Sequence, residues 1–317
     1  MSGLKFAELL NLMAELDERT GYPMPVPPGF ASKWSEGLGL GRRGSGRLLF
    51  TGALYQLVPY IEGTVELLRS LERAEGVGWA ALRAARVASR RLDLSLLVRP
   101  DPELVEWSAR VLRSIARLLL ASGVGFDYVP ELSDMYSGAL LRDYGMAEAF
   151  RRHAERVVKA VRSAGYEELI VVDPHTMDTV TRGYQEALGV GLRAVNYMEL
   201  VRPTARRGLT VTVHDSCVYA RRLGVVDRPR ELLREAGVKV TEVSRSGRWT
   251  YCCGGPLEAL LPSLAQAVAT TRVRELAAAG DTAVTMCPIC YVNLRRASRS
   301  SGASIRLLDL AEVIGGE

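Results

Sequence analysis

The chemistry of this chain is concentrated in its cysteines. All five lie between Cys217 and Cys290, and the residues before Cys217 contain none. Four of them form two tight pairs, the doublet Cys252-Cys253 and the pair Cys287-Pro-Ile-Cys290. Thiolates gathered from three chain segments suit a soft metal ion or an iron–sulfur cluster. We therefore predict a thiolate-bound metal centre in the C-terminal part of the chain.

The number and spacing of the cysteines favour a cluster with several irons over a single metal ion. Adjacent side chains tend to diverge, so a doublet fits two irons of one cluster better than one tetrahedral zinc. Five thiolates also exceed the four of an ordinary cubane or zinc site. Three other interpretations stay open: a zinc site with one spare thiol, a thioredoxin-like dithiol at Cys287 and Cys290, and buried inert thiols.

Strand ends are expected to bring the cysteines together. Apolar runs lead directly into His214-Asp215-Ser216-Cys217 and into Cys287. Ligands of parallel sheets bind beyond the carboxyl ends of the strands, where the next helices point their positive dipole ends. Pro288 suits the first turn of such a helix, because its missing N–H costs nothing there. Gly254 and Gly255 would let the backbone pass close to a bulky inorganic group.

The rest of the chain alternates short apolar runs with helical patterns, which indicates an α/β fold with small parallel sheets. The predicted strands cover residues 47–51, 126–129, 169–172, 209–213, 238–243, 283–286 and 304–307. The predicted helices cover residues 5–17, 104–121, 147–164, 229–235 and 264–278.

The chain also resembles a duplicated unit. Asp173-Pro-His-Thr176 aligns with Cys287-Pro-Ile-Cys290, and Tyr136-Ser-Gly138 aligns with Cys252-Cys-Gly254. The run from Leu48 to Tyr55 similarly matches the run that ends at Tyr219 and places Ala53 near Cys217. Because the repeat is longer than a solenoid unit, we predict two α/β lobes related by a pseudo-twofold axis. The expected parts are an N-terminal helix and Pro/Gly-rich connector (1–45), a cysteine-free lobe (46–204) and a cluster-binding lobe (205–317).

The cysteine spacing and its flanks resemble the cysteine-rich CCG domain. The matching residues are His214-Asp-Ser-Cys217, Tyr251-Cys-Cys-Gly-Gly255 and Cys287-Pro-Ile-Cys290. This domain occurs in the B and D subunits of heterodisulfide reductase and in related iron–sulfur oxidoreductase subunits. The resemblance is strong over residues 205–317 and weak over 46–200, where the copy is cysteine-free.

The resemblance implies one noncubane [4Fe-4S] cluster per chain. Its ligands would be Cys217, Cys252, Cys253, Cys287 and Cys290, with Gly254 and Gly255 beside it. A single cluster is expected because Ala53, Tyr136, Ser137, Asp173 and Thr176 stand where many members carry the cysteines of a second one. The sequence has no Cys-x-x-Cys-x-x-Cys-x-x-x-Cys-Pro ferredoxin motif, so the electrons would come from a partner subunit, either ferredoxin-like or a flavoprotein.

The predicted function is that of an iron–sulfur oxidoreductase subunit that reduces a small disulfide. Two histidines are its candidate catalytic residues. His214 could donate a hydrogen bond to a cluster sulfur or a proton to a leaving thiolate. His175, with Tyr136 and Asp178, could line a pocket above the cluster. The alternatives are an electron-transfer or docking subunit of a flavin dehydrogenase complex and a zinc-stabilised binding module.

Five further residues have less specific expectations. Asp215 is expected to cap the helix that carries Cys217. Arg221 and Arg222 could stabilise an anionic cluster or bind an anionic substrate group. Trp249 is expected to pack near the doublet and shield the cluster from water. His153, which lies in a charged helical pattern, is expected on the surface.

Composition excludes several other classes of protein. Of the 317 residues, 48% are hydrophobic, which is ample for a packed core. The formal charge of +5 is spread along the chain without the basic stripe typical of nucleic-acid binding. No apolar run is long enough to span a membrane, and no signal peptide is recognisable. We expect a cytoplasmic protein, because five cysteines cannot all pair in disulfides.

Overall fold

Two small parallel sheets form the framework of the protein. The computed structural model describes residues 3–73, 84, 98–303 and 305–316. In the first lobe the strands have the order β1-β2-β3, and in the second the order β5-β4-β6-β7. All neighbouring strands are parallel. Their bounds are β1 Arg47–Phe50, β2 Glu168–Val171, β3 Ala194–Asn196, β4 Thr210–Val213, β5 Lys239–Val240, β6 Thr282–Thr285 and β7 Arg306–Asp309. The predicted α/β class is confirmed.

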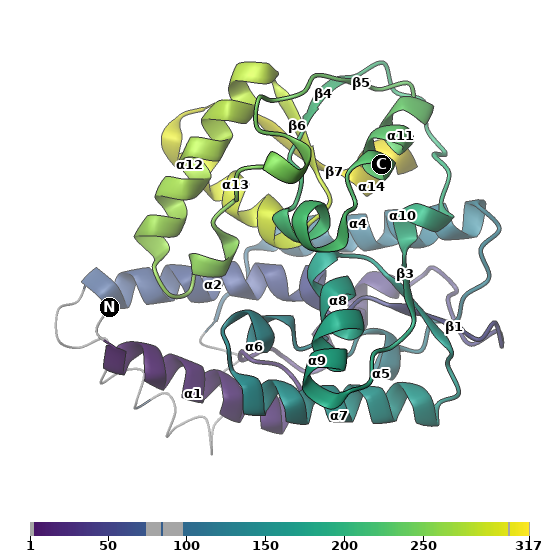
Figure 1. The fold of residues 1–317 in the computed structure, drawn as a ribbon, viewed down its shortest axis with the longest axis vertical. Coiled ribbons are helices and arrows are strands. Elements are labelled where there is room, and N and C mark those ends of the chain that lie inside the picture. The colour runs from purple at the N-terminus through teal and green to yellow at the C-terminus, as the bar shows by residue number, and fades with distance from the viewer. Residues whose placement is uncertain (1–2, 74–83, 85–97, 304, 317) are drawn as a thin grey trace.

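Helices surround both sheets (Figure 1). Up to residue 200 they are α1 Gly3–Thr20, η1 Phe30–Ser35, α2 Leu54–Arg73, α4 Pro102–Ala121, α5 Pro130–Ser133, α6 Ala139–Asp143, α7 Ala147–Ser163, α8 Pro174–Asp178, η3 Thr179–Gly183, α9 Tyr184–Leu188 and α10 Tyr197–Leu200. After residue 200 they are η4 Val218–Leu223, α11 Asp227–Glu235, η5 Gly247–Trp249, η6 Gly255–Leu257, α12 Pro262–Ala279, α13 Pro288–Ser301 and α14 Leu310–Gly315.

The two sheets follow the same plan. In the first lobe a single bridge joins Asp127 to Leu48 of β1, so the spatial order is this bridge, β1, β2, β3. The second lobe repeats that order with β5, β4, β6 and β7. Pro174 opens the helix that follows β2, and Pro288 opens the helix that follows β6. Each sheet therefore places its two central strand ends at equivalent positions.

The contacts between the lobes are reciprocal, as a pseudo-twofold relation requires. Helix α2 of the first lobe packs on α13 of the second, and η4 of the second packs on α8 of the first. Tyr55, at the start of α2, donates a hydrogen bond to Asp309 Oδ2 at 2.7 Å. Its counterpart Tyr219 accepts a hydrogen bond from Asn196, at the end of β3. Both Asp309 and Asn196 cap the helix that follows their strand.

The N-terminal segment lies against the first lobe. Helix α1 contacts α7, and both run along the lower edge in Figure 1. In the connector, Trp34 is buried and donates its indole N–H to Asp134. Buried residues of both lobes form one continuous core. The boundaries at residues 45 and 204 stay a prediction.

The structure differs from the sequence-based expectations at four elements. Residues 126–129 form the isolated bridge at Asp127 and no strand, and the strand expected over 238–243 is only Lys239–Val240. The strand Ala194–Asn196 was not predicted, because three residues are too short for a periodic signal. Helix α2 was not predicted either. Its sequence contains Pro59 and Gly63, both of which weaken a helical pattern.

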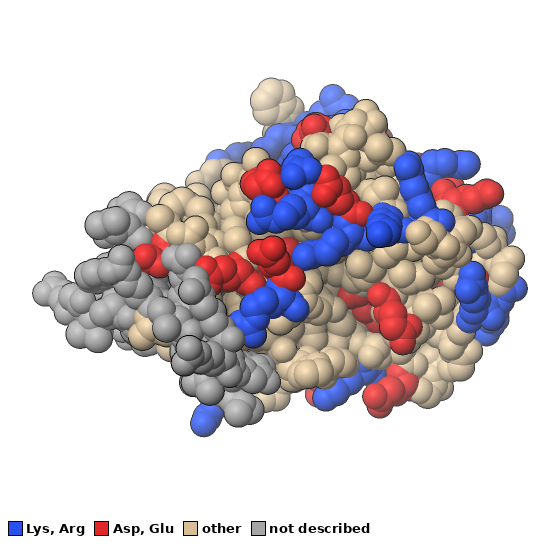
Figure 2. Space-filling view, turned by 90° about the horizontal axis from the view of Figure 1, so that it is seen from below, with Lys and Arg blue, Asp and Glu red and all other residues tan. Residues whose placement is uncertain are grey.

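Charges of both signs are interleaved on the face that is seen in Figure 2. The helix α7 contributes ion pairs of Glu148 with Arg151 at 3.0 Å and with Arg152 at 3.1 Å. Among the described residues, no helix is both long and apolar enough to cross a membrane.

Candidate metal centre

Three segments of the second lobe bring the five cysteines together. Cys217 lies at the start of η4, which follows β4. The doublet lies on the loop between η5 and η6. Cys287 caps helix α13 after β6, and Cys290 lies in its first turn. Cys253, Cys287 and Cys290 are buried, whereas Cys217 and Cys252 are half-buried. The predicted convergence at the carboxyl ends of β4 and β6 is therefore what the structure shows.

The thiols contact one another in an unbroken series. Cys217 contacts Cys252, Cys252 contacts Cys253, Cys253 contacts Cys290, and Cys290 contacts Cys287. Hydrogen bonds within the series raise the pKa of Cys217 and lower that of Cys252. Burial would raise the pKa of Cys287, but hydrogen bonds from Cys290 and His175 hold it well below its ordinary value. Five thiols joined in one series of contacts form a donor set for a group larger than one ion.

The two glycines after the doublet are required by the close packing there. Gly254 has φ +81°, and a Cβ on it would lie 2.7 Å from the carbonyl oxygen of Ala265. A Cβ on Gly255 would lie 2.4 Å from Cγ2 of Ile289 and 3.4 Å from Sγ of Cys253. Their backbone N–H groups donate to the doublet, from Gly254 to Cys252 Sγ at 3.3 Å and from Gly255 to Cys253 Sγ at 3.4 Å. The glycines thus allow close packing around the doublet, because they have no side chain, and they donate hydrogen bonds to its sulfur atoms.

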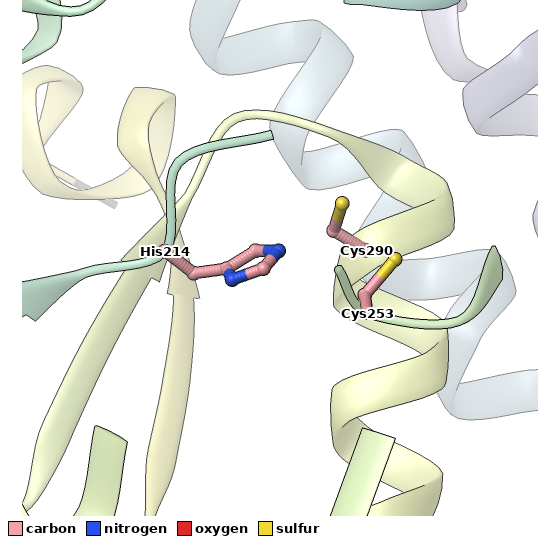
Figure 3. A group of neighbouring side chains, drawn as sticks. All are labelled: His214, Cys253 and Cys290. Carbon is pink, nitrogen blue, oxygen red and sulfur yellow. The ribbon is translucent and has the colours of Figure 1, made fainter. Parts of the chain in front are cut away.

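His214 points its ring at two of the sulfur atoms. A ring nitrogen of His214 and the Sγ atoms of Cys253 and Cys290 lie within 4.8 Å of one another (Figure 3). On the other side of the ring, Arg272 Nε donates a hydrogen bond to Nδ1 at 3.0 Å. Arg272 is completely buried, and so is His214 to within 1%. Burial and the charge of Arg272 lower the pKa of His214 to about 3, which keeps the ring neutral.

This contact fixes the tautomer of His214. An arginine has only donors, so Nδ1 must be the acceptor, and the single ring proton of the neutral imidazole must lie on Nε2. Nε2 is buried and has no hydrogen-bond partner among the described residues. His214 therefore presents an N–H donor to the cysteine sulfurs, and in this tautomer Nε2 has no lone pair with which to bind a metal ion.

His175 reaches the cysteines from the first lobe. It lies in the first turn of α8, and its Nδ1 is 2.9 Å from Oδ2 of Asp143 at the end of α6. Burial would lower the pKa of His175, but hydrogen bonds to Asp143 and Cys287 raise it well above its ordinary value. The structure thus places both candidate histidines against cysteines, His214 against Cys253 and Cys290, and His175 against Cys287.

Two other residues expected beside His175 are held by partners other than the cysteines. Tyr136 is buried in the first lobe, where its hydroxyl accepts the Leu140 N–H at 2.6 Å. Asp178 is paired with Arg142 and with Arg222 at 2.8 Å, so Arg222 joins the lobes. Neither Tyr136 nor Asp178 has a described contact with a cysteine.

Three expectations were wrong. Asp215 does not cap a helix but forms a bidentate ion pair with Arg230, at 2.7 and 2.9 Å. Trp249 does not shield the cysteines, because its side chain is 84% exposed. His153 is buried and lies 2.8 Å from Asp17 of α1, because it faces the apolar side of α7.

Sequence reasoning missed Arg272, Arg230 and Asp143. A signal existed for Arg272 alone. It shares one face of α12 with Ala265, Ala269, Val273 and Leu276, which are all buried. A charged residue on an otherwise apolar helix stripe must find buried partners. Nothing in the sequence pairs Asp143 with His175 or Arg230 with Asp215.

The donor set fits an iron–sulfur cluster better than zinc. Tetrahedral zinc would use four of the donors, and the tautomer of His214 leaves only thiols available. Buried N–H donors from His214, Gly254 and Gly255 point at sulfur atoms, as is typical around iron–sulfur clusters. The site would therefore supply a cluster with thiolate ligands and with N–H groups that can donate hydrogen bonds to sulfur. The ligands would be Cys217, Cys252, Cys253, Cys287 and Cys290.

Comparison with known proteins agrees with this site. Residues 211–295 match the family model described as CCG, the cysteine-rich domain. The matched segment begins in β4, ends in α13 and includes all five cysteines. This part of the chain is therefore similar to the CCG cysteine-rich domain.

Three curated relatives of larger size are named as oxidoreductases or as a subunit of one. An EtfAB:quinone oxidoreductase of Syntrophomonas wolfei is 27% identical over 65% of this chain and 31% of its own length. A probable iron–sulfur-binding oxidoreductase of Bacillus subtilis is 24% identical over the same shares. The dihydromethanophenazine:CoB–CoM heterodisulfide reductase of Methanosarcina mazei has a subunit that is 37% identical over 33% of this chain and 27% of its own length. The chain spans about a third of the length of these relatives.

A solved aspartate racemase homologue from Pyrococcus horikoshii aligns with 67% of this chain and 91% of its own. Its TM-score is 0.27 at 13% identity, so the likeness has no bearing on fold or function. The chain is thus similar to parts of proteins named as oxidoreductases, one of them a probable iron–sulfur-binding oxidoreductase.

Proposed function

We propose that this protein is a subunit of an iron–sulfur oxidoreductase and reduces a small disulfide at a noncubane [4Fe-4S] cluster. A partner subunit, ferredoxin-like or a flavoprotein, supplies the electrons. The observation that carries the proposal is the series of five contacting thiols, from half-buried Cys217 to buried Cys287, with an N–H donor of His214 aimed at its centre. One such site per chain follows, because the first lobe has no thiols.

The bound cluster supplies single electrons at low potential. Reduction of a disulfide consumes two electrons and two protons and releases two thiols. The chain provides access at the half-buried edge, where Cys217 and Cys252 lie. His214 stabilises negative charge on sulfur through its Nε2–H. His175 contacts Cys287 from the opposite lobe and is held there by Asp143.

A second candidate is an electron-transfer or docking subunit of a flavin dehydrogenase complex. It is favoured by the match to an EtfAB:quinone oxidoreductase, which extends over 65% of this chain and so includes more than the cysteine-rich domain. In that case the same site would pass electrons without binding substrate. A zinc-stabilised binding module is the third candidate, and a zinc ion held by four cysteines would leave the fifth thiol unused.

Two measurements separate the three candidates. Iron, acid-labile sulfide and zinc are determined in protein purified without oxygen, and low-temperature EPR spectra are recorded for the oxidised and reduced states. Iron and sulfide together with an EPR signal support a cluster, whereas zinc without sulfide would refute it. Oxidised glutathione, as a probe disulfide, is then added to the reduced protein. A changed EPR signal and two thiols per disulfide support reductase activity. An unchanged signal favours the electron-transfer subunit.

A further inference from the structure

The cysteine cluster has one accessible edge. Cys217 and Cys252 are its half-buried members, and they lie on η4 and on the loop after η5. These two segments contact each other, and Arg221 of η4 donates to the carbonyl oxygen of Thr250 at 2.9 Å. A molecule that approaches the site from the side of the second lobe and exchanges electrons with it would contact these two segments first.

An exposed tryptophan projects beside that edge. Trp249 lies three residues before Cys252, and its exposed fraction of 84% is the highest among the large apolar side chains that the structure describes. Its loop is nevertheless firmly held. The Gly247 N–H donates to Asp215 Oδ2 at 2.6 Å, and the Thr250 hydroxyl donates to the Asp215 carbonyl at 2.9 Å. Since Arg230 pairs with the same carboxylate, Trp249 is held outward by buried anchors.

Two arginines adjoin Trp249: Arg248 precedes it in the chain, and Arg221 bonds to the next residue, Thr250. Within the described chain, neither Arg221 nor Arg248 has a carboxylate partner. Their neighbours Arg222 and Arg245 are neutralised, by Asp178 at 2.8 Å and by Glu275. An exposed, preorganised tryptophan flanked by guanidinium groups without carboxylate partners has the composition of an interaction hot spot. A positive rim also steers a negatively charged partner to the site.

We propose that Trp249, Arg221 and Arg248 form the docking surface for an acidic redox protein that delivers electrons at the Cys217–Cys252 edge. This inference rests on the proposed function, since it needs a redox centre at the cysteines. In each transfer the reduced partner loses one electron and the centre gains it, and no bond forms or breaks. Trp249 provides the apolar contact, while Arg221 and Arg248 set the charge of the accepted partner.

The test compares an acidic protein donor with a small dye donor. Stopped-flow reduction of the cluster-loaded protein is followed with a reduced plant-type ferredoxin as the acidic probe and with reduced methyl viologen as the dye. The variants are Trp249→Ala and Arg248→Glu. Two controls are matched to them: Leu264→Ala, another exposed apolar residue, and Arg234→Glu, an equal change of charge on α11.

We expect the wild-type rate constant with ferredoxin to fall steeply with ionic strength. Trp249→Ala and Arg248→Glu should lower it at least tenfold and leave the viologen rate and the iron content unchanged, and the controls should behave as wild type. If the cluster-loaded variants are reduced by ferredoxin at the wild-type rate, the docking surface is refuted and the proposed function is not. A protein that holds no iron and sulfide would overturn the proposed function and this surface with it.

Discussion

The contact between Arg272 and His214 yields a quantitative prediction. If Arg272 keeps the proton of His214 on Nε2, then His214→Phe removes the N–H that would donate to a sulfur of the bound cluster, and Arg272→Met removes the contact that fixes the proton there. Both substitutions should lower the midpoint potential of the cluster, because an N–H donor stabilises the more negative, reduced state more strongly.

The magnitude follows from the energy of one such bond. A hydrogen bond to a charged group contributes roughly 1.5–3 kcal/mol, and the part that differs between the two oxidation states is about 1 kcal/mol. For a one-electron couple, about 1.4 kcal/mol corresponds to about 59 mV. His214→Phe should therefore lower the potential by about 40 mV. Arg272→Met should lower the midpoint potential by a similar amount. Loss of its fully buried positive charge should lower the potential further, because that charge favours the more negative, reduced state.

A double-mutant cycle separates the two roles. Potentials are measured by EPR-monitored titration for both single variants and for the double variant, with Arg274→Met, on the exposed side of α12, as the control. If Arg272 acts through His214, the two shifts are not additive. Nitrogen NMR of the apoprotein should independently show His214 as the Nε2–H tautomer in wild type and as a mixture in Arg272→Met. An unchanged potential in His214→Phe, at equal cluster content, would refute the reasoning.

Two further predictions concern stability. Gly254→Ala combines backbone strain at φ +81° with an approach of 2.7 Å to Ala265, whereas its control Gly302→Ala has strain at φ +67° and open space around the new methyl group. Chemical denaturation should therefore show a free energy of unfolding that falls by about 1 kcal/mol or more further in Gly254→Ala than in Gly302→Ala. Equal losses would contradict the packing argument. Burial raises the pKa of Asp134 to about 7, so the folded state favours its neutral form and stability should fall as pH rises from about 4 to 7, by at most about 4 kcal/mol. Asp134→Asn should flatten that part of the stability profile, and an unchanged slope would contradict it.

Much of the site could be predicted because its parts are local in sequence. Cys287, Pro288 and Cys290 define a strand end and a helix start within four residues, and the structure shows both. The repeat of Asp173-Pro174 and Cys287-Pro288 likewise indicated two equivalent lobes, and the strand order agrees. Such features depend on short-range backbone rules, which a sequence displays directly.

The errors concern side chains whose surroundings come from distant segments. His153 lies on the stripe of Phe150, Ala154 and Val157, so the helical period should have outweighed the neighbouring charges. Asp215 would cap its own helix if it had no better partner, but folding brings Arg230 within 2.7 Å. Trp249 is exposed because Asp215 holds its loop, and no local pattern reveals that contact.

The first lobe explains how a cysteine-free copy can keep the same architecture. Ser137 and Thr176 occupy the positions of Cys253 and Cys290, and their hydroxyl groups are 3.3 Å apart. A Cβ on Gly52 would lie 2.1 Å from Thr176 Oγ1, so Gly52 and Thr176 pack in direct contact in this half of the molecule. The lobe thereby keeps α8 in register, and α8 is the element that carries His175 across to Cys287. A lobe without thiols therefore still supplies one wall of the centre that the other lobe holds.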